Sequence, residues 1–247
     1  MTARKQLSLD LTAPPVGNDE APPLNFRRSA RARHLQIKVG PHKGIEVIVP
    51  RNRGPDEVAR FLEANREWIR NTWQKLKRDY PEAGQLVLPQ LIRLPSLGRE
   101  WQVAFADVKR LVERGDRLLL PQAGTPLQAA LRLQAWVKQK AAAALPPRVE
   151  AWAARTGLEP GRISIRGQAT RWGSCSSRGT LSLNFRLMFL EAPEIDCLVL
   201  HELCHLQHMN HGRSFWALME RHMPGARARD RRLGEGWKLV PAWALVK

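Results

Sequence analysis

The sequence predicts an α+β protein that combines small antiparallel sheets with amphipathic helices. Two patterns support this prediction. Apolar and polar residues alternate in short runs separated by Gly and Pro, which is typical of half-buried strands. Longer segments between these runs repeat apolar residues at helical spacing. With 247 residues, 43% of them hydrophobic, the chain is long enough to bury a substantial core.

We divide the chain into three parts. Residues 1–24 are predicted to be a disordered tail, because they hold two Pro-Pro pairs and an acidic polar run. Residues 25–123 are a β-rich region with one long helix, and residues 124–247 carry a cluster of histidines. Within the tail, the run QLSLDL from Gln6 to Leu11 resembles the peptide that docks on the bacterial sliding clamp. A chance alternation of leucines is the competing interpretation.

The β-rich region begins with a predicted hairpin. Apolar residues alternate in residues 35–39 and again in residues 45–49, with a glycine-bounded turn between the two runs. Residues 54–76 follow as one amphipathic helix. Residues 86–121 contain short apolar runs separated by turns, which predict a small antiparallel sheet.

A long helix and a second hairpin come next. Residues 125–157 predict a helix that is broken or kinked at Pro146-Pro147. Residues 162–176 and 180–189 are predicted to be the two strands of the hairpin, with one buried and one polar face. Pro193 then opens a further helix.

The composition of the chain bears on its cellular location and on its binding partners. The chain has 40 Lys and Arg against 23 Asp and Glu, a net charge of +17. Such an excess favours nucleic acid or nucleotides as partners, through basic segments at residues 27–34 and 227–232, although a solubility charge is an equal alternative. Three cysteines without framework spacing indicate a reducing, cytoplasmic location. We find no secretory signal and no run long enough to span a membrane.

The stretch HELCHLQHMNH is the most informative part of the sequence. Apolar residues surround this helix on nearly every face, so we expect it to be buried. His201 and His205 lie one helical turn apart, where both imidazoles can bind one ion. Glu202 stands beside the first histidine, from where it can hold a water molecule on that ion. This is the H-E-x-x-H motif of zinc hydrolases, so Zn2+ is the predicted cofactor.

A catalytic zinc site needs a third protein ligand and one open position. We favour His211, because Asn210 and Gly212 permit a turn that returns it to the metal. Glu220 is the second choice. His208 would extend a straight row of histidines over about 10 Å of helix, so we expect it to be either a bystander or a hydrogen-bonding partner of the site.

Four pieces of sequence, RWGSC, LN.RL, HELCHL and NHG..FW, resemble the YgjP-like metallopeptidase-domain family and, more broadly, SprT-like proteases. They lie within residues 165–224, and weaker matches near Arg27 and Phe61 extend the resemblance. The resemblance implies a zincin-like minimal metalloprotease domain, built from a β-hairpin, the HExxH helix and a following helix.

The same resemblance implies a zinc site of His201, His205 and His211, with Glu202 as the catalytic residue. We predict metal-assisted hydrolysis of a peptide or protein substrate, with Glu202 as general base. Candidates for contacts with the substrate or its oxyanion lie in the preceding hairpin, and roles in strand or core are the competing interpretation for them. They are Arg171, Trp172, Asn184 and Arg186.

Two other functions stay open at this stage. The basic charge is compatible with a metal-dependent nucleoside triphosphate pyrophosphatase, although three imidazoles suit zinc better than magnesium. It is also compatible with a DNA-associated protease that acts on DNA-bound proteins.

Overall fold

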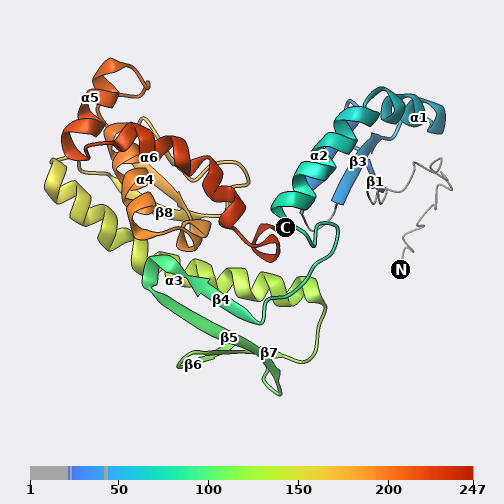
Figure 1. Ribbon diagram of the computed structural model, residues 1–247, viewed down its shortest axis with the longest axis horizontal. Helices are drawn as coiled ribbons and strands as arrows, with labels where there is room; N and C mark the ends of the chain where they lie inside the picture. Colours follow the sequence, from blue (N-terminus) through green and yellow to red (C-terminus); the bar gives the residue numbers. More distant parts are fainter. Residues whose placement is uncertain (1–21, 23, 42–43, 247) are drawn as a thin grey trace.

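The computed structural model describes residues 22, 24–41 and 44–246, so the hexapeptide at residues 6–11 lies outside the described residues. Two lobes are visible in Figure 1. The N-terminal lobe, residues 24–80, holds the first sheet and two helices. The C-terminal lobe, residues 91–246, holds two further sheets and the remaining helices.

The first sheet has the order β1-β3-β2. The predicted hairpin is confirmed, because β2 (Gln36–Gly40) pairs antiparallel with β3 (Gly44–Pro50). A third strand, β1 (Leu24–Ser29), adds in parallel to the other side of β3. The central position of β3 agrees with its composition, since Ile45 and Val47 are fully buried.

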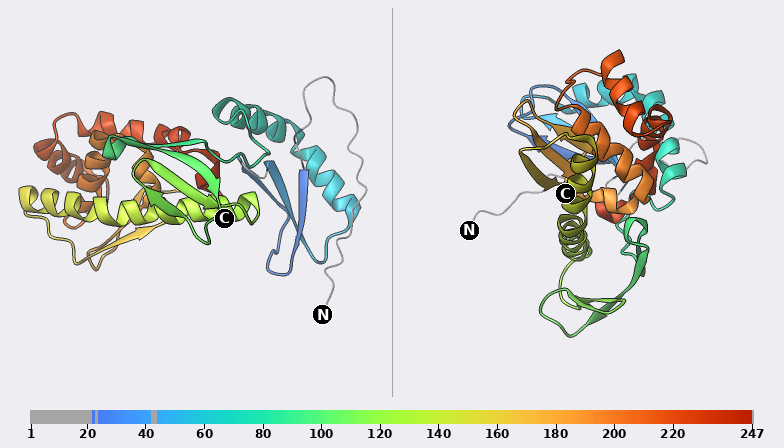
Figure 2. Two further views of the ribbon diagram at one scale, coloured as in Figure 1. Left: turned by 90° about the horizontal axis from the view of Figure 1, so that it is seen from below. Right: turned by 90° about the vertical axis from the view of Figure 1, so that its left-hand side faces the viewer.

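The predicted helix of residues 54–76 is two helices, α1 (Pro55–Ala64) and α2 (Arg66–Asp79). The break lies at Asn65, whose ψ of 9° leaves the helical region. Its side-chain nitrogen donates to the carbonyl oxygen of Phe61 at 2.7 Å. The side chain thus binds a carbonyl group that a helical backbone N–H would otherwise bind. Both helices cover one face of the first sheet (Figure 2).

The second sheet has the order β4-β5-β7-β6, and the prediction of a purely antiparallel sheet is wrong. β5 and β7 pair in parallel, whereas the two outer pairs are antiparallel. Burial explains the order, because β7 carries the fully buried Leu118 and Leu120 while β6 is short and largely exposed. The strands are β4 (Leu91–Leu94), β5 (Arg99–Ala106), β6 (Val112–Arg114) and β7 (Arg117–Pro121).

The long helix α3 (Pro126–Thr156) supports the C-terminal lobe. Thr125 caps its first turn, and Gly157 ends it in the left-handed conformation, with φ 71°. Pro146 and Pro147 lie inside the helix and do not end it, although its axis changes direction along its length in Figure 1. Its buried residues share one core with the second sheet and with the histidine-bearing helix.

The third sheet, of order β8-β10-β9, contains β8 (Arg162–Arg166), β9 (Gly173–Cys175) and β10 (Thr180–Asn184). The predicted first strand is therefore two strands, of which β9 forms the hairpin with β10 and β8 pairs in parallel. The predicted second strand ends early, at Asn184. The Asn184 side-chain oxygen accepts the N–H of Arg186 at 3.1 Å and turns the chain into a 3-10 helix, η2 (Phe185–Phe189).

Three helices complete the C-terminal lobe. They are α4 (Ala192–Cys204), α5 (Arg213–His222) and α6 (Ala226–Leu233). Short 3-10 turns lie at Pro95–Leu97, Glu235–Leu239 and Ala242–Leu245. None of the helices in the described part of the chain combines the length and apolar character that a membrane span requires.

Candidate metal centre

The helix α4 places the first two histidines. It is buried on nearly every face, as predicted, and it ends at Cys204, so that His205 is its C-terminal cap. The chain then turns through residues 206–212 and carries His211 back towards the helix. A turn that starts directly after His205 also removes His208 from the helical row that the sequence suggested.

Three imidazoles converge at the end of α4. The Nε2 atom of His201 lies 3.2 Å from that of His205 and 3.0 Å from that of His211. Bonds of about 2.1 Å to a tetrahedral zinc ion would place two ligand nitrogens about 3.4 Å apart. The three nitrogens therefore fit one ion after small adjustments, and neutral imidazoles are a donor set that zinc favours. Burial lowers the pKa of both His205 and His211, which keeps these two rings neutral.

Outer contacts orient two of these rings. The Nδ1 atom of His205 lies 3.0 Å from the backbone oxygen of His208, so that its N–H points away from the cluster. The Nδ1 atom of His201 lies 2.8 Å from a carboxylate oxygen of Asp230 on α6, by an approach too oblique for a regular hydrogen bond. Both contacts resemble the outer partners that fix metal-bound histidines. The hydrogen-bonding role predicted for His208 is thus filled by its backbone.

Sequence reasoning missed Asp230 and Phe215. Asp230 lies on another helix, and no spacing rule connects it to the H-E-x-x-H motif. Phe215 on α5 is fully buried, and its ring centroid lies 4.8–5.0 Å from the centroids of the three imidazoles. It forms an apolar support beneath the cluster. The run NHG..FW contained this phenylalanine, and its position directly after the turn was the available signal.

Glu202 is a buried carboxyl group beside the histidines. Its residue is 4% exposed, and among the described residues its Oε2 atom has no hydrogen-bond partner. Burial raises its pKa to about 7, while His201 and Arg171 act in the opposite direction. A carboxyl group with a raised pKa and a free oxygen is characteristic of a functional position.

Gly173 on β9 makes room for this carboxyl group. A Cβ atom at position 173 would lie only 2.5 Å from Oε1 of Glu202. The edge strand of the third sheet thus runs directly past the carboxylate, and a side chain there would have to displace it.

Comparison with known proteins agrees with this geometry. The family model of the YgjP-like metallopeptidase domain matches residues 33–235, which is most of the chain. The chain belongs to the YgjP-like metallopeptidase-domain family. Membership makes it a metallopeptidase at the level of the family, and implies a bound metal.

One solved structure and the curated proteins complete the comparison. The crystal structure of the metallopeptidase zymogen of Pyrococcus abyssi abylysin is 26% identical over 36% of this chain and 90% of that chain, with a TM-score of 0.34. No curated protein matches the sequence.

The alternative third ligand of this YgjP-like domain is engaged elsewhere. The two carboxylate oxygens of Glu220 accept the backbone N–H groups of Gly225 at 2.7 Å and Arg227 at 3.0 Å. These contacts lower its pKa and fix the start of α6. Among the described residues, the cluster that could hold an ion consists of His201, His205 and His211.

The four candidates for substrate contact divide into one exposed and three buried residues. Arg171 is exposed, and its positive charge lowers the pKa of Glu202, against the larger effect of burial. Trp172 is buried, and its indole N–H donates to the carbonyl of Leu233 at 2.8 Å.

Asn184 and Arg186 shape the loop before β9. The Asn184 amide donates to the carbonyls of Gln168 and Arg171, at 2.8 and 3.0 Å. Arg186 donates to the carbonyls of Ala244 and Gln168, at 2.6 and 3.2 Å, and burial lowers its pKa to about 10. Both side chains are occupied by backbone partners, and they hold the segment that carries Arg171.

Proposed function

We propose that the protein is a zinc-dependent metallopeptidase that hydrolyses peptide bonds, with His201, His205 and His211 as metal ligands. The observation that carries this proposal is the convergence of three Nε2 atoms beside a buried carboxyl group with a free oxygen. A zinc ion in this position supplies a Lewis acid, which acidifies water and polarises a carbonyl group.

Residues of the chain would supply proton transfer, orientation of the metal ligands and contacts with the substrate. Glu202 takes a proton from the attacking water and transfers it to the leaving amine. A pKa of about 7 suits both steps, because neither protonation state is strongly favoured near neutral pH. Asp230 and the carbonyl of His208 keep the ligand rings in place. Arg171, the exposed candidate of the four, is proposed to contact the substrate or its oxyanion.

Elemental analysis of purified variants tests the ligand set. We expect about one zinc per chain in the wild type and a large loss of zinc in His211→Ala. His208→Ala is the matched control, because only its backbone takes part in the site, and it should retain zinc. Full retention of zinc in His211→Ala would reject the proposed third ligand.

Assays of activity test the reaction. Peptide cleavage and pyrophosphate release from nucleoside triphosphates are measured side by side for the wild type and Glu202→Gln. We expect peptide cleavage alone, and its loss in the variant. Pyrophosphate release that depends on Glu202 would favour the nucleotide pyrophosphatase.

The net charge of +17 favours a substrate bound to a polyanion, as in a DNA-associated protease. Binding of duplex DNA that weakens steeply with salt is the expected signature. Absence of such binding would remove this version of the function and leave the peptidase proposal intact.

A further inference from the structure

A groove lies in the N-terminal lobe, away from the metal centre. One wall is formed by residues 35–38, at and just before β2, and the other by Phe61, Asn65 and Trp68. The groove is open to solvent and has a volume of about 420 Å³. Nothing in the proposed peptidase mechanism uses it.

The strand wall presents a backbone edge. Side chains of a strand alternate between its two faces. Because four consecutive residues line the groove, the groove must run along the backbone edge of the strand. β2 is at the edge of its sheet and, within the described residues, pairs with β3 alone. Its outer N–H and C=O groups can therefore receive another strand.

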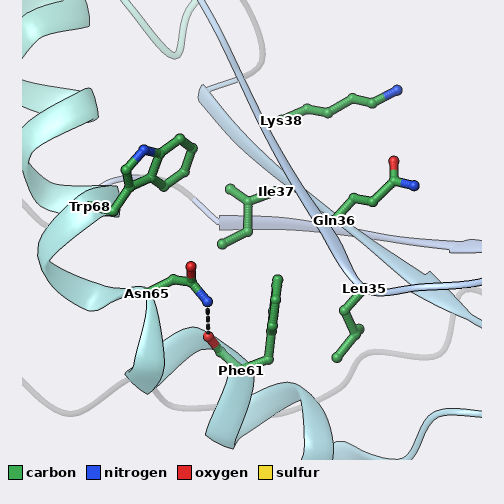
Figure 3. Close-up of a pocket in the computed structure, with 7 residues that line it drawn as sticks. All are labelled: Leu35, Gln36, Ile37, Lys38, Phe61, Asn65 and Trp68. Atoms are coloured by element: carbon green, nitrogen blue, oxygen red, sulfur yellow. Dashed lines mark hydrogen bonds between the residues drawn. The ribbon is translucent and has the colours of Figure 1, made fainter.

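The helical wall presents apolar rings. Phe61 on α1, Asn65 at the break and Trp68 on α2 all line the groove. Trp68 is 51% exposed, so its ring is accessible from the groove. In Figure 3, Ile37 points towards the space between Trp68 and Phe61, while Gln36 and Lys38 point away from the helices. An edge strand facing apolar helical side chains is an arrangement that binds an extended peptide as an added strand.

We propose that residues 6–11 of this same chain, QLSLDL, dock in the groove as an additional strand beside β2. In an extended conformation, Leu7, Leu9 and Leu11 project on one face, where they can contact the rings of the helical wall. Ser8 and Asp10 project on the opposite face, the side to which Lys38 points. The hexapeptide thus complements the groove in both its apolar and its charged face.

The chain is long enough to make this connection. Leu24 at the start of β1 is opposite Ile45, which is opposite Val39 in β2, so the chain enters the sheet level with the end of β2. Residues 12–23 can span up to about 40 Å when extended. The distance across the sheet from β1 to β2 is two strand spacings, about 10 Å.

Hydrogen exchange of the full-length protein tests the docking. In the double variant Leu7→Asp/Leu9→Asp, we expect the amides of β2 to exchange at least about tenfold faster than in the wild type. Ala13→Asp/Val16→Asp is the matched control, since it places the same two charges in the tail outside the hexapeptide, and it should leave the exchange of β2 unchanged. Equal exchange of β2 in the wild type and the double variant would overturn the proposal.

The groove side is tested by Trp68→Ala, which should increase the exchange of residues 6–11. Exchange of residues 6–11 at the rate of a free peptide in the wild type would overturn the proposal and leave the hexapeptide to an outside partner such as a sliding clamp. Protection that disappears on dilution would instead mean that the tail of a second copy fills the groove, and would overturn docking within one chain. Neither measurement depends on metal or on peptidase activity.

Discussion

The proposed metal centre and the groove in the N-terminal lobe differ in whether neighbouring residues already contact their functional groups. At the proposed metal centre, Asp230, the carbonyl of His208 and the ring of Phe215 contact the imidazole rings. In the groove, a strand edge and the half-exposed Trp68 have yet to receive a partner among the described residues. The histidine cluster is therefore held by its neighbours, whereas the groove leaves a strand edge and an aromatic ring open.

Glu202→Gln should have the largest effect on catalysis and no effect on the groove. It removes the proton acceptor while leaving the ligands intact, so we expect peptide hydrolysis to fall by about 10²- to 10⁴-fold. Zinc content and the exchange of β2 should not change. The rate is measured with a fluorogenic peptide, and activity close to that of the wild type would show that Glu202 is not the base.

Gly173→Ala probes how closely the metal centre is packed. The added methyl group would lie 2.5 Å from Oε1 of Glu202, so the carboxylate must move. We expect a loss of about 10² in kcat with zinc retained, because displacement of a catalytic group by about 1 Å has effects of this size.

Gly212→Ala is the matched control for Gly173→Ala. Gly212 also lies beside the site, but a Cβ atom there meets no atom within 4 Å. Similar kcat values for the two variants would show that the close contact at Gly173 has no role in positioning Glu202.

Asp230→Asn tests whether the outer contacts matter for the metal. Loss of the carboxylate beside His201 should weaken zinc affinity by about 10- to 100-fold, as measured by competition with a chelator. Glu235→Gln, an exposed acid on the next element, should leave the affinity unchanged. An Asp230→Asn affinity equal to that of the wild type would mean that His201 is held by packing alone.

Trp68→Ala should have the smallest effect on catalysis. The side chain is half exposed and lies in the other lobe, so cleavage of a short peptide should stay at the wild-type rate. The rate is measured with the fluorogenic peptide used for Glu202→Gln. A fall in kcat would show that the two regions are coupled.

Local patterns predicted the parts of the fold that depend on neighbours in the sequence. The hairpin of β2 and β3 and the buried helix α4 follow from periodicity and turn residues. The return of His211 to the cluster was predicted from a left-handed turn at Asn210 and Gly212. His211 does return, but the turn begins directly after His205 and the φ of Gly212 is −74°.

Long-range pairing was not predictable in this way. The parallel partners β1 of β3 and β7 of β5 are chosen by burial of whole strands, which no local pattern records. Asp230 reaches His201 only because α6 packs on α4. The break at Asn65 was missed because the apolar spacing continues through it, while one side-chain hydrogen bond ends the helix.

Tyr80 connects the N-terminal lobe to the C-terminal lobe. Its hydroxyl donates to the carbonyl of Trp237 at 2.8 Å, and the ring of Trp237 stacks on that of Trp172 at 4.1 Å. The residue after Trp172, Gly173, leaves the space in which the carboxyl group of Glu202 lies. The N-terminal lobe is therefore connected to the strand beside Glu202 through one hydrogen bond and one stacked pair of indole rings.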